Sequence, residues 1–267
     1  MPKIKVNDIE MHYEVTGSGA PLVLISGLGY PLWQWHRMTP YLAQHFQVIA
    51  FDNRGVGQTD KPAGPYTAQM LAADTAGLLD ALGIQKAAVL GHSMGGFIAQ
   101  ALALDFPHKV SKLILASTNF GGPHHVPITP EAMAVLADFT SDPVTRFKNG
   151  LRVSTAPGFP ESHPDIIQMW LEWRIANPLD IAGYQAQMAI GLALLPEATC
   201  FEHRLSNVTI PTLILFGAHD KVVPPANADL LARQIPNSKT VIFPDAGHFF
   251  SMEIPEAASQ AVIEFLK

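Results

Sequence analysis

Uninterrupted apolar runs alternate with helical patterns over most of this chain. Such runs, bounded by Gly, Pro and polar residues, are typical of strands buried on both faces of a parallel sheet. They lie at residues 22–25, 47–51, 87–90, 112–116, 211–216 and 239–243. Helical patterns lie between or after them, at residues 32–44, 67–82, 97–106, 225–234 and 255–266. The alternation predicts an α/β fold in which a parallel sheet is covered by helices on both faces.

The first fifteen residues follow a different pattern, in which polar and apolar positions alternate. Residues 3–6 and 10–15 read as the two strands of a hairpin, with Asn7-Asp8 as its turn. Together with the six apolar runs, this hairpin predicts a mostly parallel central sheet of about eight strands.

The strand–helix alternation stops after Ser117 and resumes at Pro211. Residues 121–195 contain helical patterns, prolines and large apolar side chains, but no convincing buried strand. We therefore expect a helical cap at 121–195, inserted into a core made of residues 1–120 and 196–267. Its position between two buried strands places it on the side of the sheet where ligands bind in such folds.

Composition bounds the class of protein. The 267 residues are 48% hydrophobic and only 15% charged, which suits one globular core. The net charge of -6 gives no indication of a positively charged surface that would bind nucleic acid. Cys200 is the single cysteine, so no internal disulfide forms, as expected in a reducing compartment. No signal-peptide core or membrane-spanning run is visible, and we expect a cytoplasmic protein. The sequence leaves open whether it is a monomer or a homodimer.

A Gly-x-Ser-x-Gly segment carries the clearest chemical signal. Gly91-His92-Ser93-Met94-Gly95 joins an apolar run to a helical pattern. This is the pattern of a nucleophile elbow, in which a sharp strand–turn–helix places a strained serine at a helix N-terminus. Gly91 and Gly95 are needed because the turn leaves almost no room for side chains. Ser93 is therefore the candidate nucleophile.

A serine hydroxyl needs a base, and the base needs a group that orients it. Asp220 and His248 each follow directly after an apolar run, so they are expected at the same sheet edge as Ser93. Asp245 competes for the acid role but lies too close in sequence to His248. His92 is expected to pack beside the elbow, and Asp52 to hold a turn.

Four segments resemble the α/β-hydrolase fold family, in particular its capped esterases and enol-lactonases, and the resemblance extends over nearly the whole chain. They are Gly91–Gly96, Phe51–Asp60, Leu215–Asp220 and Ala246–Phe250. The order Ser, Asp, His is also that of this family. The resemblance implies a Ser93–His248–Asp220 triad.

The family's oxyanion hole uses two backbone N–H groups. By position these belong to Met94, which follows the nucleophile, and to Leu28 in the loop after the first buried run. The family often has His-Gly-x-Gly in that loop, whereas this chain has Ser26-Gly27-Leu28-Gly29, so the loop shape departs from the pattern.

These residues predict a serine hydrolase that cleaves carboxylic esters of short to medium acyl chain through an acyl-enzyme on Ser93. No metal or organic cofactor is required, and no pair of arginines suited to a dianionic acid is evident. The partner is a small-molecule ester. Beside Leu28 and Met94, the candidate pocket residues are Tyr30, Trp33, Met133, Phe139, Phe147, Trp170 and Met188.

Other activities share the same three residues. The resemblance also covers enol-lactonases, C–C bond hydrolases and cofactor-free perhydrolases, which the pocket alone distinguishes. An alternative hypothesis from a different class of function is that the protein is a ligand receptor of this fold and not an enzyme. Ser93 argues against the dehalogenases and epoxide hydrolases of this fold, which need a carboxylate nucleophile.

Overall fold

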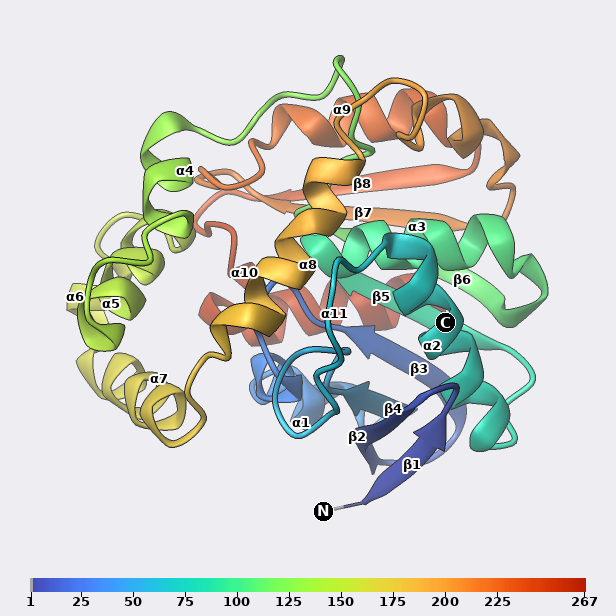
Figure 1. The fold of residues 1–267 in the computed structure, drawn as a ribbon. Helices are drawn as coiled ribbons and strands as arrows, with labels where there is room; N and C mark the ends of the chain where they lie inside the picture. Colours follow the sequence, from blue (N-terminus) through green and yellow to red (C-terminus); the bar gives the residue numbers. More distant parts are fainter. Residues whose placement is uncertain (1) are drawn as a thin grey trace.

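The computed structural model of the protein describes residues 2–267 and has an eight-stranded sheet at its centre (Figure 1). The strand order is β1-β2-β4-β3-β5-β6-β7-β8. β1 and β2 form an antiparallel hairpin and β2 pairs antiparallel with β4, whereas all other neighbours are parallel. The strands are β1 (Lys3–Val6), β2 (Ile9–Thr16), β3 (Ala20–Ile25), β4 (Phe46–Phe51), β5 (Ala87–His92), β6 (Val110–Ala116), β7 (Thr212–Gly217) and β8 (Ser238–Phe243). The predicted sheet is confirmed.

Two apolar layers cover the two faces of this sheet. Successive strand residues point to opposite faces, and accordingly Val23 and Val89 belong to one layer while Leu24 and Leu90 belong to the other. The first layer is closed by α2 (Ala68–Ala81), α3 (Met94–Asp105) and α9 (Ala226–Gln234). The second is closed by α1 (Thr39–Leu42) and α11 (Pro255–Leu266).

The predicted helix at 32–44 is wrong in detail. The segment folds as a 3₁₀ turn, η1 (Leu32–Trp35), followed by the short helix α1. Pro40 explains the break, because proline has no N–H to donate and its ring clashes with the carbonyl four residues earlier, so it is tolerated only at the start of a helix. In α1 it stands in the first turn.

Five α-helices follow β6 and precede β7, and the described chain has no strand between these two. They are α4 (Pro130–Leu136), α5 (Pro143–Ser154), α6 (Phe159–Ser162), α7 (Pro164–Ala176) and α8 (Ile181–Ala193). Figure 1 shows α4–α7 gathered to one side of the sheet, with α8 crossing back over it. They contact the loops after β3 and β8: Arg174 donates to the carbonyl of Gly29, and Ser154 accepts from the N–H of Phe249.

Short elements absent from the prediction complete the chain. These are η2 (Pro107–Lys109), η3 (Glu202–Asn207) and α10 (Phe250–Glu253). Among residues 2–267, no helix has the length and apolar character needed to cross a membrane.

Candidate active site

The β5–α3 junction has the geometry of a nucleophile elbow. Ser93 lies between the two elements with φ 55° and ψ −120°, a strained conformation for a residue with a side chain. A Cβ on Gly91 would lie 2.2 Å from the carbonyl oxygen of Gly95, and a Cβ on Gly95 would lie 2.2 Å from that of Ile25. Only glycines allow the turn to pack this closely against β3, as the sequence pattern predicts.

His248 and Asp220 meet beside this elbow. The Nδ1 atom of His248 lies 2.8 Å from Oδ2 of Asp220, and the other carboxylate oxygen of Asp220 accepts from the N–H groups of Val222 and Val223 at 2.9 and 2.8 Å. Both side chains are buried, and the carboxylate is held by three hydrogen bonds. Asp245, the sequence competitor, is exposed. Asp220 is therefore the residue placed to orient His248.

Ser93 and His248 line one small cavity of about 70 Å³, together with Gly27 and Leu28. The Ser93 hydroxyl forms no hydrogen bond with another described residue. Catalytic hydrogen bonds of this kind often tighten only when substrate is bound. The N–H of Leu28 has no acceptor in the described chain, and Met94 opens α3, where an N–H has no intrahelical partner. Both amides are available to an oxyanion.

His92 connects the two loops that border this cavity. Its Nε2 lies 2.8 Å from the carbonyl oxygen of His248, and its Nδ1 lies 2.9 Å from Nε2 of Gln34. The Gln34 amide oxygen accepts from the N–H of Gly27. Because a carbonyl accepts and an amide NH₂ donates, His92 carries its proton on Nε2. Burial, aided by the nearby His248, lowers the pKa of His92 well below its usual range, so the ring is neutral and serves as a fixed link.

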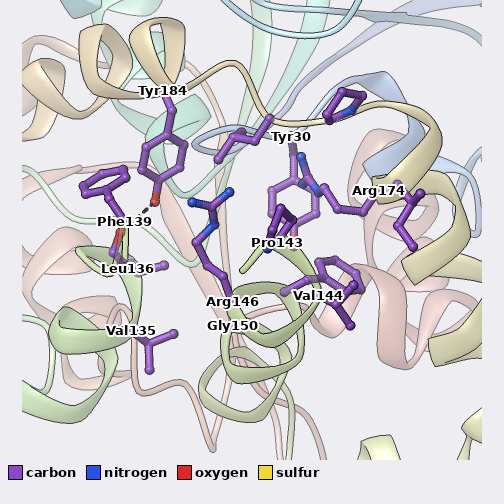
Figure 2. A pocket seen from close by; sticks show the side chains of 14 residues that line it. Tyr30, Val135, Leu136, Phe139, Pro143, Val144, Arg146, Gly150, Arg174 and Tyr184 are labelled. Atoms are coloured by element: carbon purple, nitrogen blue, oxygen red, sulfur yellow. Dashed lines mark hydrogen bonds between the residues drawn. The ribbon is translucent and has the colours of Figure 1, made fainter. Parts of the chain in front are cut away.

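A second, larger cavity of about 410 Å³ lies next to the serine cavity, since Tyr30 and Leu136 line both. Figure 2 shows it between helices of the 121–195 segment, with Tyr30 on one side and Tyr184 on the other. The Tyr184 hydroxyl donates to the carbonyl of Leu136 at 3.2 Å. Burial, followed by the neighbouring Tyr30, raises the pKa of Tyr184 to about 12. The volume falls within the range of about 300–1,000 Å³ that is usual for small-molecule sites.

Three of the predicted pocket residues, Tyr30, Phe139 and Phe147, line this larger cavity. The other four predicted pocket residues are not among the described residues that line this cavity. Trp170 is fully buried in the packing of α7, where its Nε1 donates to His36 at 3.2 Å, and Trp33 lines a different cavity of about 220 Å³. Met133 is 46% exposed on α4, and neither it nor Met188 is among the described residues that line the larger cavity.

Two arginines that sequence reasoning missed line the larger cavity. Arg146 lies on α5 and Arg174 on α7, and no such pair of arginines is evident from the sequence. The two residues are far apart in sequence and line one cavity only because two helices pack together, so no local pattern reveals them. In Figure 2 the Arg146 side chain extends into the cavity between Tyr30 and Tyr184.

Asp52 has the structural role expected for it. Its carboxylate accepts from the N–H groups of Leu32 and Gln58 and bonds to Nδ1 of His12. Within residues 2–267, no group of three or more His, Cys, Asp or Glu side chains is arranged to hold a metal ion.

Comparison with known proteins places this geometry in a family. The model of the alpha/beta hydrolase fold family matches residues 20–255 of the chain. The protein therefore belongs to the alpha/beta hydrolase fold family. This membership supports the prediction that the protein is a hydrolase.

Individual relatives differ in the activity that their names state. A putative non-heme bromoperoxidase of Mycobacterium tuberculosis is 32% identical, over 96% of this chain and 97% of its own length. A thermophilic esterase from Thermogutta terrifontis has a TM-score of 0.83 and 29% identity, with 100% of this chain and 98% of the other covered. The enol-lactonase from Burkholderia xenovorans has a TM-score of 0.84 and 29% identity, with 99% of each chain covered.

Proposed function

We propose that this protein is a serine hydrolase that cleaves carboxylic esters of short to medium acyl chain through an acyl-enzyme on Ser93. The observation that carries the proposal is the His248–Asp220 hydrogen bond of 2.8 Å, beside a cavity that Ser93, His248 and Leu28 share. The similarity to a structurally characterised esterase supports it.

The proposed reaction has two halves. His248 takes the proton of Ser93 as Oγ attacks the ester carbonyl, and the oxyanion accepts hydrogen bonds from the N–H groups of Leu28 and Met94. The protonated His248, held by Asp220, gives its proton to the leaving alcohol. Water then attacks the acyl-enzyme by the same route, with release of the acid and restoration of the Ser93 hydroxyl.

The same proposal assigns residues 121–195 as a lid over the active site. Gly29 and Phe249, which flank the oxyanion loop and His248, are both hydrogen-bonded to this segment. The 410 Å³ cavity beside Tyr30 would hold the acyl chain. Its limited volume favours short and medium chains over long ones.

The test is the initial rate of hydrolysis of 4-nitrophenyl esters from acetate to palmitate. The wild-type rate should peak at short or medium chains, and Ser93→Ala should lose at least about 10⁴-fold in kcat because the nucleophile is gone. Ser162→Ala, at an exposed position of α6, is the control for loss of a serine hydroxyl. Retained activity in Ser93→Ala would refute the mechanism. Fastest cleavage of the palmitate ester would refute the proposal that the cavity under the lid limits the length of the acyl chain.

Assays of the same enzyme preparation on other substrates distinguish the related activities. Turnover of enol-lactones or of C–C bonded ring-cleavage products without turnover of esters would reassign the substrate but keep Ser93. Peracid formation from acetate and hydrogen peroxide would identify a perhydrolase. Turnover far below one per second on every substrate, with tight ligand binding, would favour a receptor over an enzyme.

A further inference from the structure

The larger cavity combines apolar walls with two positive charges. Leu136, Phe139 and Phe147 supply much of the apolar wall, and the guanidinium groups of Arg146 and Arg174 enter it from α5 and α7 (Figure 2). No Asp or Glu is among the residues that line it. A simple apolar acyl chain would leave both cations without a counterion and would withdraw water from these half-buried charges, which is costly.

Neither arginine is neutralised elsewhere in the described chain. The ion pairs of residues 2–267 include Arg54 with Asp8 and Asp74, and Arg204 with Asp105, but none that involves Arg146 or Arg174. The Arg146 guanidinium also forms no hydrogen bond with another described residue. It lies in the first turn of α5, where a positive charge opposes the helix dipole, so its place there does not stabilise the helix.

Arg174 is held in place but keeps donors free. Its guanidinium carbon lies 4.8 Å from the ring centroid of Tyr30, 5.5 Å from that of Trp33 and 5.9 Å from that of Phe147. One N–H donates to the carbonyl of Gly29 at 3.1 Å. A guanidinium has five N–H donors, so this preorganised side chain can still bind an oxyanion.

We infer that Arg146 and Arg174 form a carboxylate-binding subsite, and that the substrates are esters or lactones whose acyl part carries a second, distal carboxylate. The planar fork of a guanidinium matches a carboxylate. Since Tyr30 and Leu136 line both cavities, an acyl group bound at Ser93 extends past them with its far end toward the arginines. The inference rests on the proposed function for the bond that is cleaved.

The experiment compares substrates that differ only at the far end of a six-carbon acyl chain. These are the 4-nitrophenyl monoester of adipic acid, its methyl ester, and 4-nitrophenyl hexanoate. We expect kcat/KM of the charged monoester to exceed that of both neutral substrates by at least about tenfold, because only the carboxylate pairs with the arginines. A ratio of one or below in the wild type would overturn the inference.

Variants tie that ratio to the cavity. Arg146→Gln should lower the charged-to-neutral ratio at least about tenfold, and Arg146→Lys should restore part of it through its charge. Arg152→Gln is the matched control, because Arg152 is exposed on the same helix and is not among the residues lining the cavity. An equal loss in Arg152→Gln would show that net charge, rather than this subsite, sets the preference.

A binding measurement separates this inference from the proposed function. Titration calorimetry of Ser93→Ala with adipate should detect binding, and the added substitution Arg146→Gln should weaken it at least about tenfold. Adipate binding without turnover of any ester would leave the subsite standing and refute the esterase. Rapid hydrolysis of neutral esters, with no adipate binding and no charge preference, would refute the subsite and leave the esterase.

Discussion

Glu253 is a buried carboxyl group that joins the 121–195 segment to the loop bearing His248. It accepts from the N–H of Ala156 at 2.6 Å and from that of Gly247 at 2.9 Å. Burial raises the pKa of Glu253 to about 7, although both hydrogen bonds act in the opposite direction. The group is therefore neutral in the folded protein over a pH range in which it is charged in the unfolded chain.

This pKa makes stability depend on pH. Because the folded pKa of Glu253 lies above the usual value of 4.5, the contribution of this group to the free energy of unfolding is complete below pH 4.5. That contribution is lost as pH rises to about 7. We expect Glu253→Gln to be less stable than wild type at pH 4.5 by about 1–3 kcal/mol, because one backbone N–H loses its acceptor. The difference in free energy of unfolding between wild type and Glu253→Gln should narrow by up to about 3 kcal/mol between pH 4.5 and 8, because only wild type loses stability as Glu253 ionises.

Free energies of unfolding from urea titrations at several pH values check this. Glu256→Gln, at an exposed position of α11, should follow the pH dependence of wild type. A gap between wild type and Glu253→Gln that stays constant or widens with rising pH would contradict the expectation.

How much of the site could be predicted differs between its two parts. Ser93 directly follows β5, whereas Asp220 and His248 lie in the loops after β7 and β8. Strand patterns therefore bring all three to one edge of the sheet. The cavity residues depend instead on how helices pack, which no periodicity records. Arg146 and Arg174 are therefore not evident from the sequence, whereas Trp170, an apolar residue at helical spacing predicted to line the pocket, is buried in the core.

Among secondary-structure elements, the junction of β5 with α3 is tightly constrained by its sequence. The elbow packs so closely on the end of β3 that a methyl group at position 95 would overlap the carbonyl of Ile25. The strands were predictable because each is a bounded apolar run. The break in the helix expected at 32–44 was missed because hydrophobic periodicity does not record it, although Pro40 is a sequence signal for that break.

The elbow gives a sharp prediction for Gly95→Ala. The added Cβ, 2.2 Å from the carbonyl oxygen of Ile25, must push α3 away from β3, and we expect a loss of at least about 3 kcal/mol in the free energy of unfolding. Thermal or urea unfolding measures it.

Gly150→Ala is the matched control for that substitution. Gly150 lies inside α5, and a Cβ there has nothing within 4 Å. Alanine is the better helix former, so this variant should gain about 0.5–1 kcal/mol. If both variants lost stability alike, close packing at the elbow would not be the cause of the Gly95→Ala effect.

In the whole molecule, Gln187 fixes α8 to the loops that follow β3 and β4. Its amide oxygen accepts from the N–H of Gly29 at 2.9 Å, and its NH₂ group donates to the carbonyl of Arg54 at 2.8 Å. The side chain is 1% exposed, so neither backbone group has water as an alternative partner. Gln187 therefore couples the position of α8 to the loop that carries Leu28.

We expect Gln187→Leu to loosen this contact without unfolding the sheet. Each buried backbone group left without a partner costs about 1–3 kcal/mol. Hydrogen exchange should become faster for the amide of Gly29 and for α8, while the amides of β3, β5 and β6 keep their protection. Gln185→Leu, on an exposed position of α8, should leave exchange unchanged. Uniformly faster exchange across the sheet would instead indicate a global loss of stability.

The larger cavity is lined by Tyr30 and otherwise only by residues between 135 and 184. The three proposed catalytic residues, in contrast, all follow strands of the sheet. Under the proposed function, the residues that cleave the bond and nearly all of those that contact the acyl chain are therefore encoded in separate segments of the gene. Mutations confined to the intervening segment can then alter which substrate is accepted, while the three residues proposed to break the bond are inherited unchanged.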